Sequence, residues 1–171
     1  MFETMQKIAI ALMVGAAAVG AVRDWSRDVP SVTADYYTQT RTGGEIEARY
    51  TAMGEYDVTY AEYPARDVLI KRYEIWYPSD LAQENREWPV VVMANGTGVP
   101  ATRYAPVFRH LASWGFVVIG NEMQNSWSGE ASAGALDLLA ELNEDPSSPF
   151  FQKLDLDNVG SAGHSQGAIG A

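Results

Sequence analysis

The stretch VGSAGHSQGA, residues 159–168, decides the fold that we expect for this chain. A short run of small and apolar residues leads into GHSQG (163–167), and small residues that can open a helix follow. Gly-x-Ser-x-Gly between a strand and a helix is the pattern of a nucleophile elbow. The turn forces the central residue, Ser165, into a strained backbone conformation and exposes its hydroxyl above the sheet. Glycines flank it because side chains there would collide with the neighbouring strand or helix.

The pentapeptide alone is weak evidence. Since Gly and Ser each make up about 7% of average proteins, Gly-x-Ser-x-Gly arises by chance in roughly one chain in twenty of this size. The context of the motif must therefore support the interpretation.

The composition limits the classes of function. The chain has 171 residues, enough for one domain with a core. It carries 12 Lys and Arg against 22 Asp and Glu, a net charge of −10, which gives no electrostatic basis for binding nucleic acid or an anionic membrane. Cysteine is absent, and His110 and His164 are the two histidines. Disulfides, cysteine nucleophiles and Cys- or His-rich metal sites are thereby excluded, and we expect neither metal nor cofactor.

Residues 1–21 are predicted to be a signal peptide or an N-terminal anchor. A lysine precedes an apolar run over residues 8–22 that ends in small residues, with cleavage expected after Ala18 or Ala21. At about 15 residues the run is short for a transmembrane helix, which needs about 20. Export, to the medium or a periplasm, is the favoured interpretation. An acidic residue near the start leaves an uncleaved membrane anchor open, and a buried core helix is the third alternative.

The next segments predict the entry into the fold. Residues 22–44 are polar and contain Pro and Gly breakers, so we expect an irregular lead-in. In the Tyr-rich segment 45–63, apolar and polar residues alternate in places, which predicts a half-exposed strand. Residues 71–77 predict a strand more clearly, because Tyr73, Ile75 and Tyr77 would lie on one face. Both are expected to be antiparallel edge strands that precede a parallel core.

Two strand–helix units follow. Residues 89–94 and 116–120 are continuous apolar runs typical of strands buried on both faces. An amphipathic helix starts near Tyr104 and ends at Gly115, and a second helix is expected to be capped by Ser132. Alternating strands and helices predict an α/β fold with a parallel sheet and right-handed crossovers.

The Gly-rich loop Asn95–Gly98 (NGTG) leaves the first of these strands, and GHSQG leaves a later one. Ligands of such sheets bind at the C-terminal ends of the strands, so we expect both turns to form one site. In acyl transfer the oxyanion needs preplaced N–H donors, and Gln166 and the NGTG loop can supply them. An ordinary strand-to-helix turn is the alternative for NGTG. A phosphate-binding loop is disfavoured because no Lys follows.

From about Trp88 onward the chain resembles an α/β-hydrolase of the dienelactone-hydrolase and cutinase-like (polyester-hydrolase-like) branch. The matching segments are NGTG (95–98), LASWGFVV (111–118), ALDLL (135–139), DNVG (157–160) and GHSQG (163–167). The resemblance implies that Ser165 is the nucleophile and that Gln166 and Thr97 give the oxyanion N–H groups. Relatives often have His where this chain has Asn95, a change that concerns loop support more than the backbone donor.

The resemblance also implies that residues 45–171 are the N-terminal half of an α/β-hydrolase domain, truncated after the elbow. In this fold the catalytic acid and His follow the nucleophile in the chain, and too few residues remain before Ala171 to supply them. We expect His164 and His110 to be structural and Asp137 to have no catalytic role. Without a base the serine stays protonated, so the 171-residue polypeptide alone is expected to be nearly inactive.

The sequence thus predicts an exported serine hydrolase that acts on carboxylic esters, either small or polymeric. A non-catalytic remnant or binding protein with the same half-fold is the alternative from a different class. An acyltransferase or peptidase on the same scaffold also remains open. A membrane partner is expected only through an uncleaved N-terminal segment.

Overall fold

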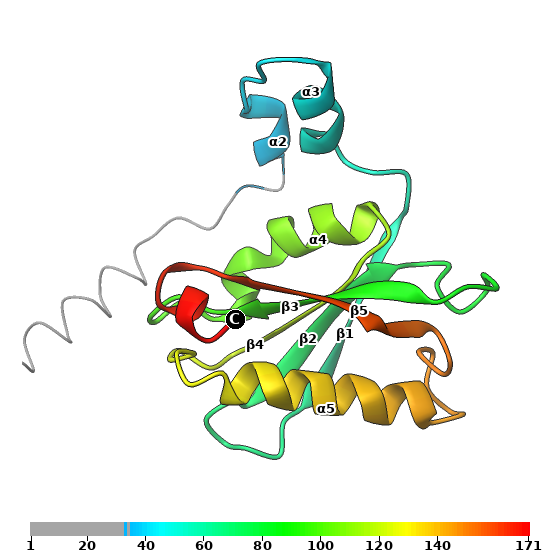
Figure 1. The fold of residues 1–171 in the computed structure, drawn as a ribbon, viewed down its shortest axis with the longest axis vertical. Helices are drawn as coiled ribbons and strands as arrows, with labels where there is room; N and C mark the ends of the chain where they lie inside the picture. Colours follow the sequence, from blue (N-terminus) through cyan, green and yellow to red (C-terminus); the bar gives the residue numbers. More distant parts are fainter. Residues whose placement is uncertain (1–32, 34) are drawn as a thin grey trace, which may run out of the picture. The chain divides into compact units, whose positions relative to one another are not determined.

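A mixed sheet of five strands, in the order β1-β2-β4-β3-β5, forms the centre of this α/β protein (Figure 1). The computed structural model describes residue 33 and residues 35–171, so the expected signal peptide or anchor lies outside the described residues. The strands are β1 (Val58–Pro64), β2 (Arg72–Pro78), β3 (Trp88–Ala94), β4 (Val117–Asn121) and β5 (Leu154–Gly163). β2 is antiparallel to both β1 and β4, whereas β3 is parallel to both β4 and β5. The expected antiparallel strands before a parallel core are therefore confirmed.

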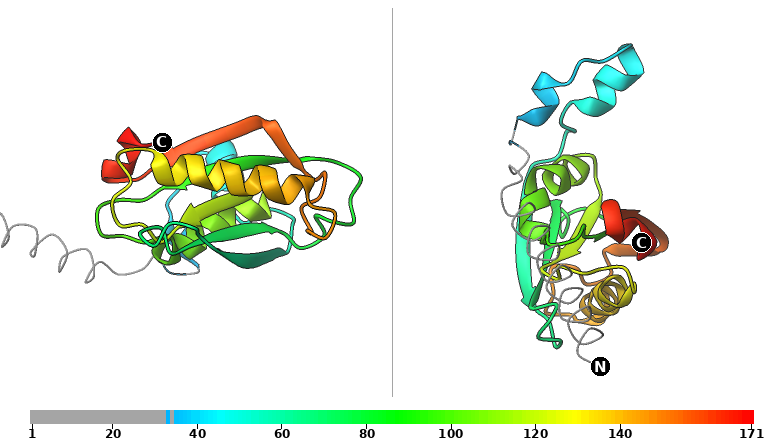
Figure 2. Two further views of the ribbon diagram at one scale, coloured as in Figure 1. Left: turned by 90° about the horizontal axis from the view of Figure 1, so that it is seen from below. Right: turned by 90° about the vertical axis from the view of Figure 1, so that its left-hand side faces the viewer.

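Helices cover both faces of this sheet. The helix α4 (Ala105–Ser113) covers one face and α5 (Glu130–Glu144) covers the other. The remaining helices are α2 (Tyr36–Gln39), α3 (Glu45–Thr51) and the 3-10 helices η1 (Ala101–Tyr104) and η2 (Ser165–Ile169). Figure 1 shows α4 on one side of the sheet and α5 on the other, and Figure 2 gives the same arrangement from two further directions. No helix in the described part of the chain is long and apolar enough to cross a bilayer.

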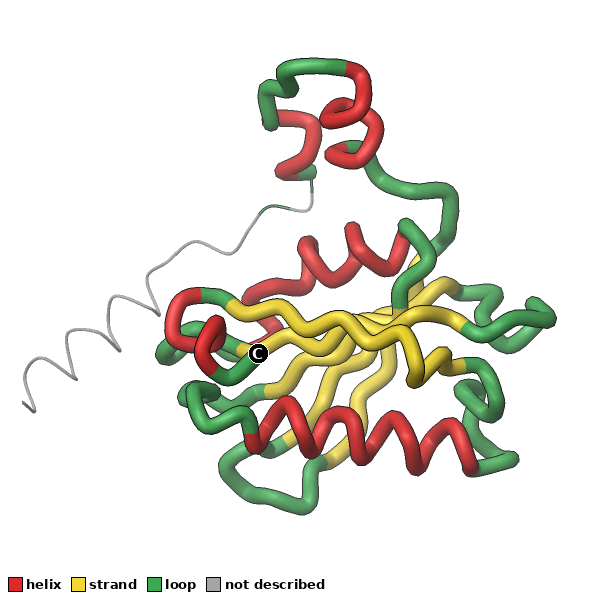
Figure 3. The backbone as a smooth tube through the Cα atoms, in the orientation of Figure 1, coloured by secondary structure: helices red, strands yellow, loops and turns green. Residues whose placement is uncertain are grey.

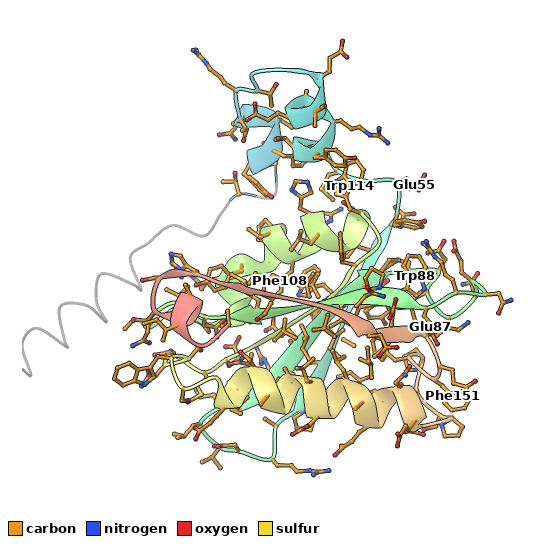
Figure 4. All side chains as sticks on the ribbon, in the orientation of Figure 1. Glu55, Glu87, Trp88, Phe108, Trp114 and Phe151 are labelled. Atoms are coloured by element: carbon orange, nitrogen blue, oxygen red, sulfur yellow. The ribbon has the colours of Figure 1, made fainter. Side chains whose placement is uncertain are left out.

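Each face of the sheet has its own hydrophobic cluster. The side chains of β3 are alternately more and less buried, and Val90 and Val92 pack into the larger cluster together with Ala135 and Leu139 of α5. Phe108 of α4 is fully buried in the second cluster, and Figure 4 shows its side chain between α4 and the sheet. The buried apolar runs of the sequence therefore become the central strands.

The segment 45–63 was predicted as one strand, and this is wrong for its first part. Residues Glu45–Thr51 form α3, and the strand begins only at Val58. The sequence of α3 explains the difference, because Glu45 and Glu47 lie in its first turn and Arg49 in its last, where each charge favours the helix dipole. The one-turn helix α2 likewise interrupts the lead-in that was predicted to be irregular.

Two further expectations need correction. β2 is an interior strand paired with β1 and β4, not an edge strand. Ser132 does not cap α5, because the N-cap is Gly129, with φ of 76°, and Ser132 lies inside the first turn. Its hydroxyl instead donates to the carbonyl oxygen of Gly170 at 3.1 Å, which joins α5 to the end of η2.

The C-terminal ends of β3, β4 and β5 lie at one edge of the sheet, because these strands are parallel. Figure 3 shows the loops after β3 and β4 and the helix η2 at this same end. The register pairs Ala94, the last residue of β3, with Gly163, the last residue of β5. The NGTG loop and the GHSQG turn therefore start from adjacent strands at the same level. The sequence predicts the shared edge but not this adjacency.

Candidate active site

Ser165 stands in a strained turn directly after β5. Its φ is 54°, in the left-handed region that non-glycine residues rarely adopt. The chain leaves β5 at Gly163 and enters η2 at Ser165, and the Gly167 N–H donates to the His164 carbonyl oxygen at 2.9 Å. The geometry is the strained strand–turn–helix that the motif predicts, although the helical segment described here is a short 3-10 helix.

The two glycines of the turn allow a close backbone approach. A Cβ atom on Gly163 would collide with the carbonyl oxygen of Gly167, and one on Gly167 would collide with the carbonyl oxygen of Ala94. The Gly167 Cβ would also lie 2.5 Å from the carbonyl oxygen of Asn95. Glycine is thus required because backbone atoms, which cannot move aside as a side chain can, fill the space around both positions.

Among residues 96–99, which begin inside the NGTG loop, one backbone N–H is unpaired. The Gly96 N–H donates to the Tyr104 hydroxyl at 3.1 Å, the Gly98 N–H to the Gln124 carbonyl at 3.0 Å, and the Val99 N–H to the Gly96 carbonyl at 3.0 Å. Within residues 35–171 the Thr97 N–H has no hydrogen-bond partner. Among these four consecutive residues, Thr97 is therefore the one whose N–H is available to a ligand.

The turn after β5 presents a second such donor. The Gln166 N–H has no partner in the described part of the chain, whereas the neighbouring His164 N–H donates to the Ala94 carbonyl at 3.1 Å. That bond joins the elbow to the end of β3, from which the Thr97 loop departs. Thr97 and Gln166, the two predicted oxyanion donors, thus lie on turns that leave adjacent strands at one sheet edge.

Asn95 supports the loop from beneath. Its side chain is fully buried, and its Nδ2 donates to the carbonyl oxygens of Asn121 at 2.6 Å and Met123 at 2.7 Å. The Asn121 Oδ1 in turn accepts the Met123 N–H at 3.0 Å. These bonds tie the loop after β3 to the loop after β4. The contacts agree with the expectation that a change at position 95 concerns loop support.

The two histidines make contacts that fit structural roles. His164 Nδ1 lies 2.8 Å from the Tyr104 hydroxyl, and no hydrogen bond joins it to Ser165. His110 lies on α4, where its Nδ1 contacts the Tyr36 hydroxyl and its Nε2 the Tyr50 carbonyl, so that α2 and α3 are held against α4. Asp137 is exposed on α5. The Ser165 hydroxyl has no hydrogen-bond partner among residues 35–171.

One buried carboxyl near this edge was not anticipated. Glu74 of β2 is 2% exposed, and its pKa is raised from 4.5 to about 7 by burial, by the negative charge of Glu122 and by a hydrogen bond to that side chain. Arg72 opposes the shift through an ion pair at 3.5 Å. The Glu122 Oε1 also accepts the Thr102 N–H at 3.2 Å, in the η1 segment that follows the loop. No sequence pattern indicates this burial, because residues 71–77 predict an edge strand.

Among the described residues, no group of three or more His, Asp or Glu side chains is arranged to hold a metal ion.

In comparisons with known proteins, no family model matches the chain and no curated protein matches it.

Proposed function

We propose that this chain carries the nucleophile and the oxyanion donors of a serine hydrolase of the α/β-hydrolase type, in the dienelactone-hydrolase and cutinase-like branch, acting on carboxylic esters. The observation that carries the proposal is the left-handed φ of 54° at Ser165, in a turn whose neighbours present the unpaired N–H groups of Thr97 and Gln166. A strained backbone of this kind costs about 1–3 kcal/mol, and such residues cluster at active sites. The strain at Ser165 therefore supports a functional role for its exposed hydroxyl.

The arrangement of the turns supports this assignment. In the α/β-hydrolase fold the nucleophile turn follows one strand, and an oxyanion N–H comes from the loop between an earlier strand and its helix. Here the elbow follows β5, the NGTG loop lies between β3 and η1, and β3 and β5 are neighbours in the sheet. The antiparallel strands that precede the parallel ones agree with the same fold.

The proposed chemistry is acyl transfer. The Ser165 oxygen attacks the ester carbonyl carbon, the carbonyl π electrons move to its oxygen, and the Thr97 and Gln166 N–H groups stabilise the resulting oxyanion. The ester oxygen then leaves as the alcohol, and water releases the acid from the acyl-serine. A general base must take the serine proton, and no residue of the described part holds that position. We therefore assign the general base to no residue among 35–171.

The test is covalent labelling of Ser165 by a fluorophosphonate, which adds to activated serines. The 171-residue chain is treated with the probe, with and without imidazole as an external base, and the modified residue is located by peptide mass spectrometry. We expect slow labelling at Ser165 that imidazole accelerates, and none in Ser165→Ala. Ser161→Ala is the matched control, because Ser161 is an exposed serine on β5, the strand that leads to Ser165. Equal labelling of the Ser165→Ala chain would contradict the proposal.

The unpartnered Ser165 hydroxyl also favours the second candidate, a non-catalytic protein that keeps the same turns for binding. Assays of ester hydrolysis and of ester binding distinguish the two candidates, and they should use the full polypeptide that the gene encodes. Hydrolysis of p-nitrophenyl esters that is lost in Ser165→Ala supports the hydrolase. Tight ester binding without turnover, unchanged in Ser165→Ala, supports the binding protein.

A further inference from the structure

The side chain of Tyr104 joins the two turns of the candidate site. Tyr104 ends η1 and is 8% exposed, and its ring lies beside Phe108, with 6.2 Å between ring centroids. Its hydroxyl oxygen accepts the Gly96 N–H at 3.1 Å and lies 2.8 Å from His164 Nδ1. Gly96 precedes the proposed donor Thr97, and His164 precedes the proposed nucleophile Ser165. One hydroxyl therefore bridges the residues immediately before each functional group.

We propose that Tyr104 is a positioning residue that sets the oxyanion donor of Thr97 relative to the elbow, through hydrogen bonds to Gly96 and His164. The inference rests on the proposed hydrolase function. It assigns to Tyr104 a role that no motif of the sequence indicates.

The geometry of the peptide group explains how Tyr104 acts on Thr97. The Thr97 N–H belongs to the same planar peptide unit as the Gly96 carbonyl, so the direction of one fixes the direction of the other. That carbonyl accepts the Val99 N–H, and the Gly96 N–H donates to Tyr104. Gly96 is thus held at both of its peptide groups, and the free N–H of Thr97 points in a fixed direction.

The contact with His164 sets the distance between the turns. A Cβ on Gly96 would lie 2.5 Å from His164 Nδ1, so glycine is needed for the imidazole to approach the loop this closely. The second tie is the His164 N–H bond to the Ala94 carbonyl at 3.1 Å. Together a side-chain bond and a backbone bond hold the elbow against the loop.

Proton counting assigns the direction of the Tyr104–His164 bond. A phenol has one proton to donate and an oxygen that accepts, and the oxygen already accepts the Gly96 N–H. Each group is satisfied when the Tyr104 hydroxyl donates to an unprotonated Nδ1, with the imidazole proton on Nε2. The opposite direction would leave the proton of the buried hydroxyl without a partner among the described residues, which is costly. The chain of bonds runs from Gly96 N–H to Tyr104 O–H to His164 Nδ1.

The test uses Tyr104→Phe, which keeps the ring and removes the hydroxyl, with Tyr36→Phe as the matched control. Tyr36 makes a second tyrosine–histidine bond among the described residues, to His110 on α4. Fluorophosphonate labelling of Ser165 in the presence of imidazole is expected to slow about 10-fold in Tyr104→Phe, less than the loss of a whole oxyanion donor. Tyr36→Phe should label at the wild-type rate. His164→Ala should slow labelling similarly, and the double variant should be no slower than either single one.

A second readout does not need reactivity. Nitrogen-15 NMR of the histidine side chains should show His164 with an unprotonated Nδ1 in the wild type, and this signal should shift in Tyr104→Phe but not in Tyr36→Phe. Wild-type labelling rates together with an unchanged His164 signal in Tyr104→Phe overturn the positioning role and leave the hydrolase proposal intact. A wild-type chain that is never labelled, with or without imidazole, overturns the hydrolase proposal, and with it the positioning role of Tyr104. Additive effects in the double variant also contradict the bridge.

Discussion

The two turns of the candidate site are held by different forces, although they leave adjacent strands at the same sheet edge. The loop Asn95–Gly98 is fixed by side-chain hydrogen bonds, from buried Asn95 to the carbonyls after β4 and from Gly96 to Tyr104. The elbow, residues 163–167, is fixed mainly by close backbone packing, at glycines whose Cβ positions are occupied by carbonyl oxygens.

This difference determines how each turn can be damaged. A backbone packed against backbone cannot accept an added atom, but the packing itself does not depend on a charge. A polar network tolerates changes of shape better, but it depends on paired donors and acceptors and on the charges beside it. We therefore expect steric substitutions to act most on the elbow, and changes of pH to act on the loop side.

The largest effect is expected for Gly167→Ala. Its Cβ would overlap the Ala94 and Asn95 carbonyl oxygens, so the elbow would have to move away from β3. We expect the free energy of unfolding to fall by about 3 kcal/mol or more, as for severe overpacking, and labelling of Ser165 to be lost. Urea unfolding of the two chains measures the first quantity.

The matched control is Gly160→Ala on β5. There the nearest atoms to an added Cβ are the Val90 carbonyl oxygen at 3.8 Å and Val91 Cγ2 at 3.9 Å, an ordinary contact. Its unfolding free energy should change by less than about 0.5 kcal/mol, as at most surface sites. Similar losses in both variants would mean that close packing does not hold the elbow.

The second prediction concerns Glu74, whose partner Glu122 accepts the Thr102 N–H on the loop side. The pKa of the Glu74 carboxyl is raised from 4.5 to about 7 in the folded protein, so folding is favoured when this carboxyl is protonated. Its contribution to stability is therefore fully present below pH 4.5. This contribution, up to about 3 kcal/mol, is lost as the pH rises from 4.5 through 7. Glu74→Gln should unfold with a flatter pH dependence and be the more stable chain at pH 8.

Thermal or urea unfolding between pH 4.5 and 8 checks this prediction, with Glu144→Gln at the exposed end of α5 as the control. The control should keep the wild-type slope. An unchanged slope in Glu74→Gln would show that the buried carboxyl does not make the loop side pH-sensitive.

The smallest effect is expected for Ser165→Gly compared with Ser165→Ala. Both remove the hydroxyl, but alanine keeps the cost of a Cβ at φ of 54°, and glycine does not. The glycine variant should be more stable than the alanine variant by about 1 kcal/mol in urea unfolding. Equal stabilities would show that the turn stores no strain at this position.

The sequence predicted the central elements well. Strands β3 and β4 agree with the predicted runs 89–94 and 116–120 to within one residue at each end, because long apolar runs have few alternatives to burial. The prediction failed for α3, where short-range helix preferences outweighed a few aromatic residues in alternation. It also failed for the position of β2 in the sheet, because no residue pattern states which strands will lie on both sides of a given strand.

For the site, the motif GHSQG between a predicted strand and a predicted helix indicated a strained serine between glycines, because the backbone constraint of such a turn is local. The sequence predicted that both turns lie at one sheet edge, but the tertiary structure alone decided that β3 and β5 are adjacent, that Glu74 is buried and that Tyr104 bridges the turns. Each depends on which strands become neighbours, and sheet order is set by packing over the whole domain. The sequence by itself determined a turn that can expose a serine, and the order β4-β3-β5 brought the donors to it.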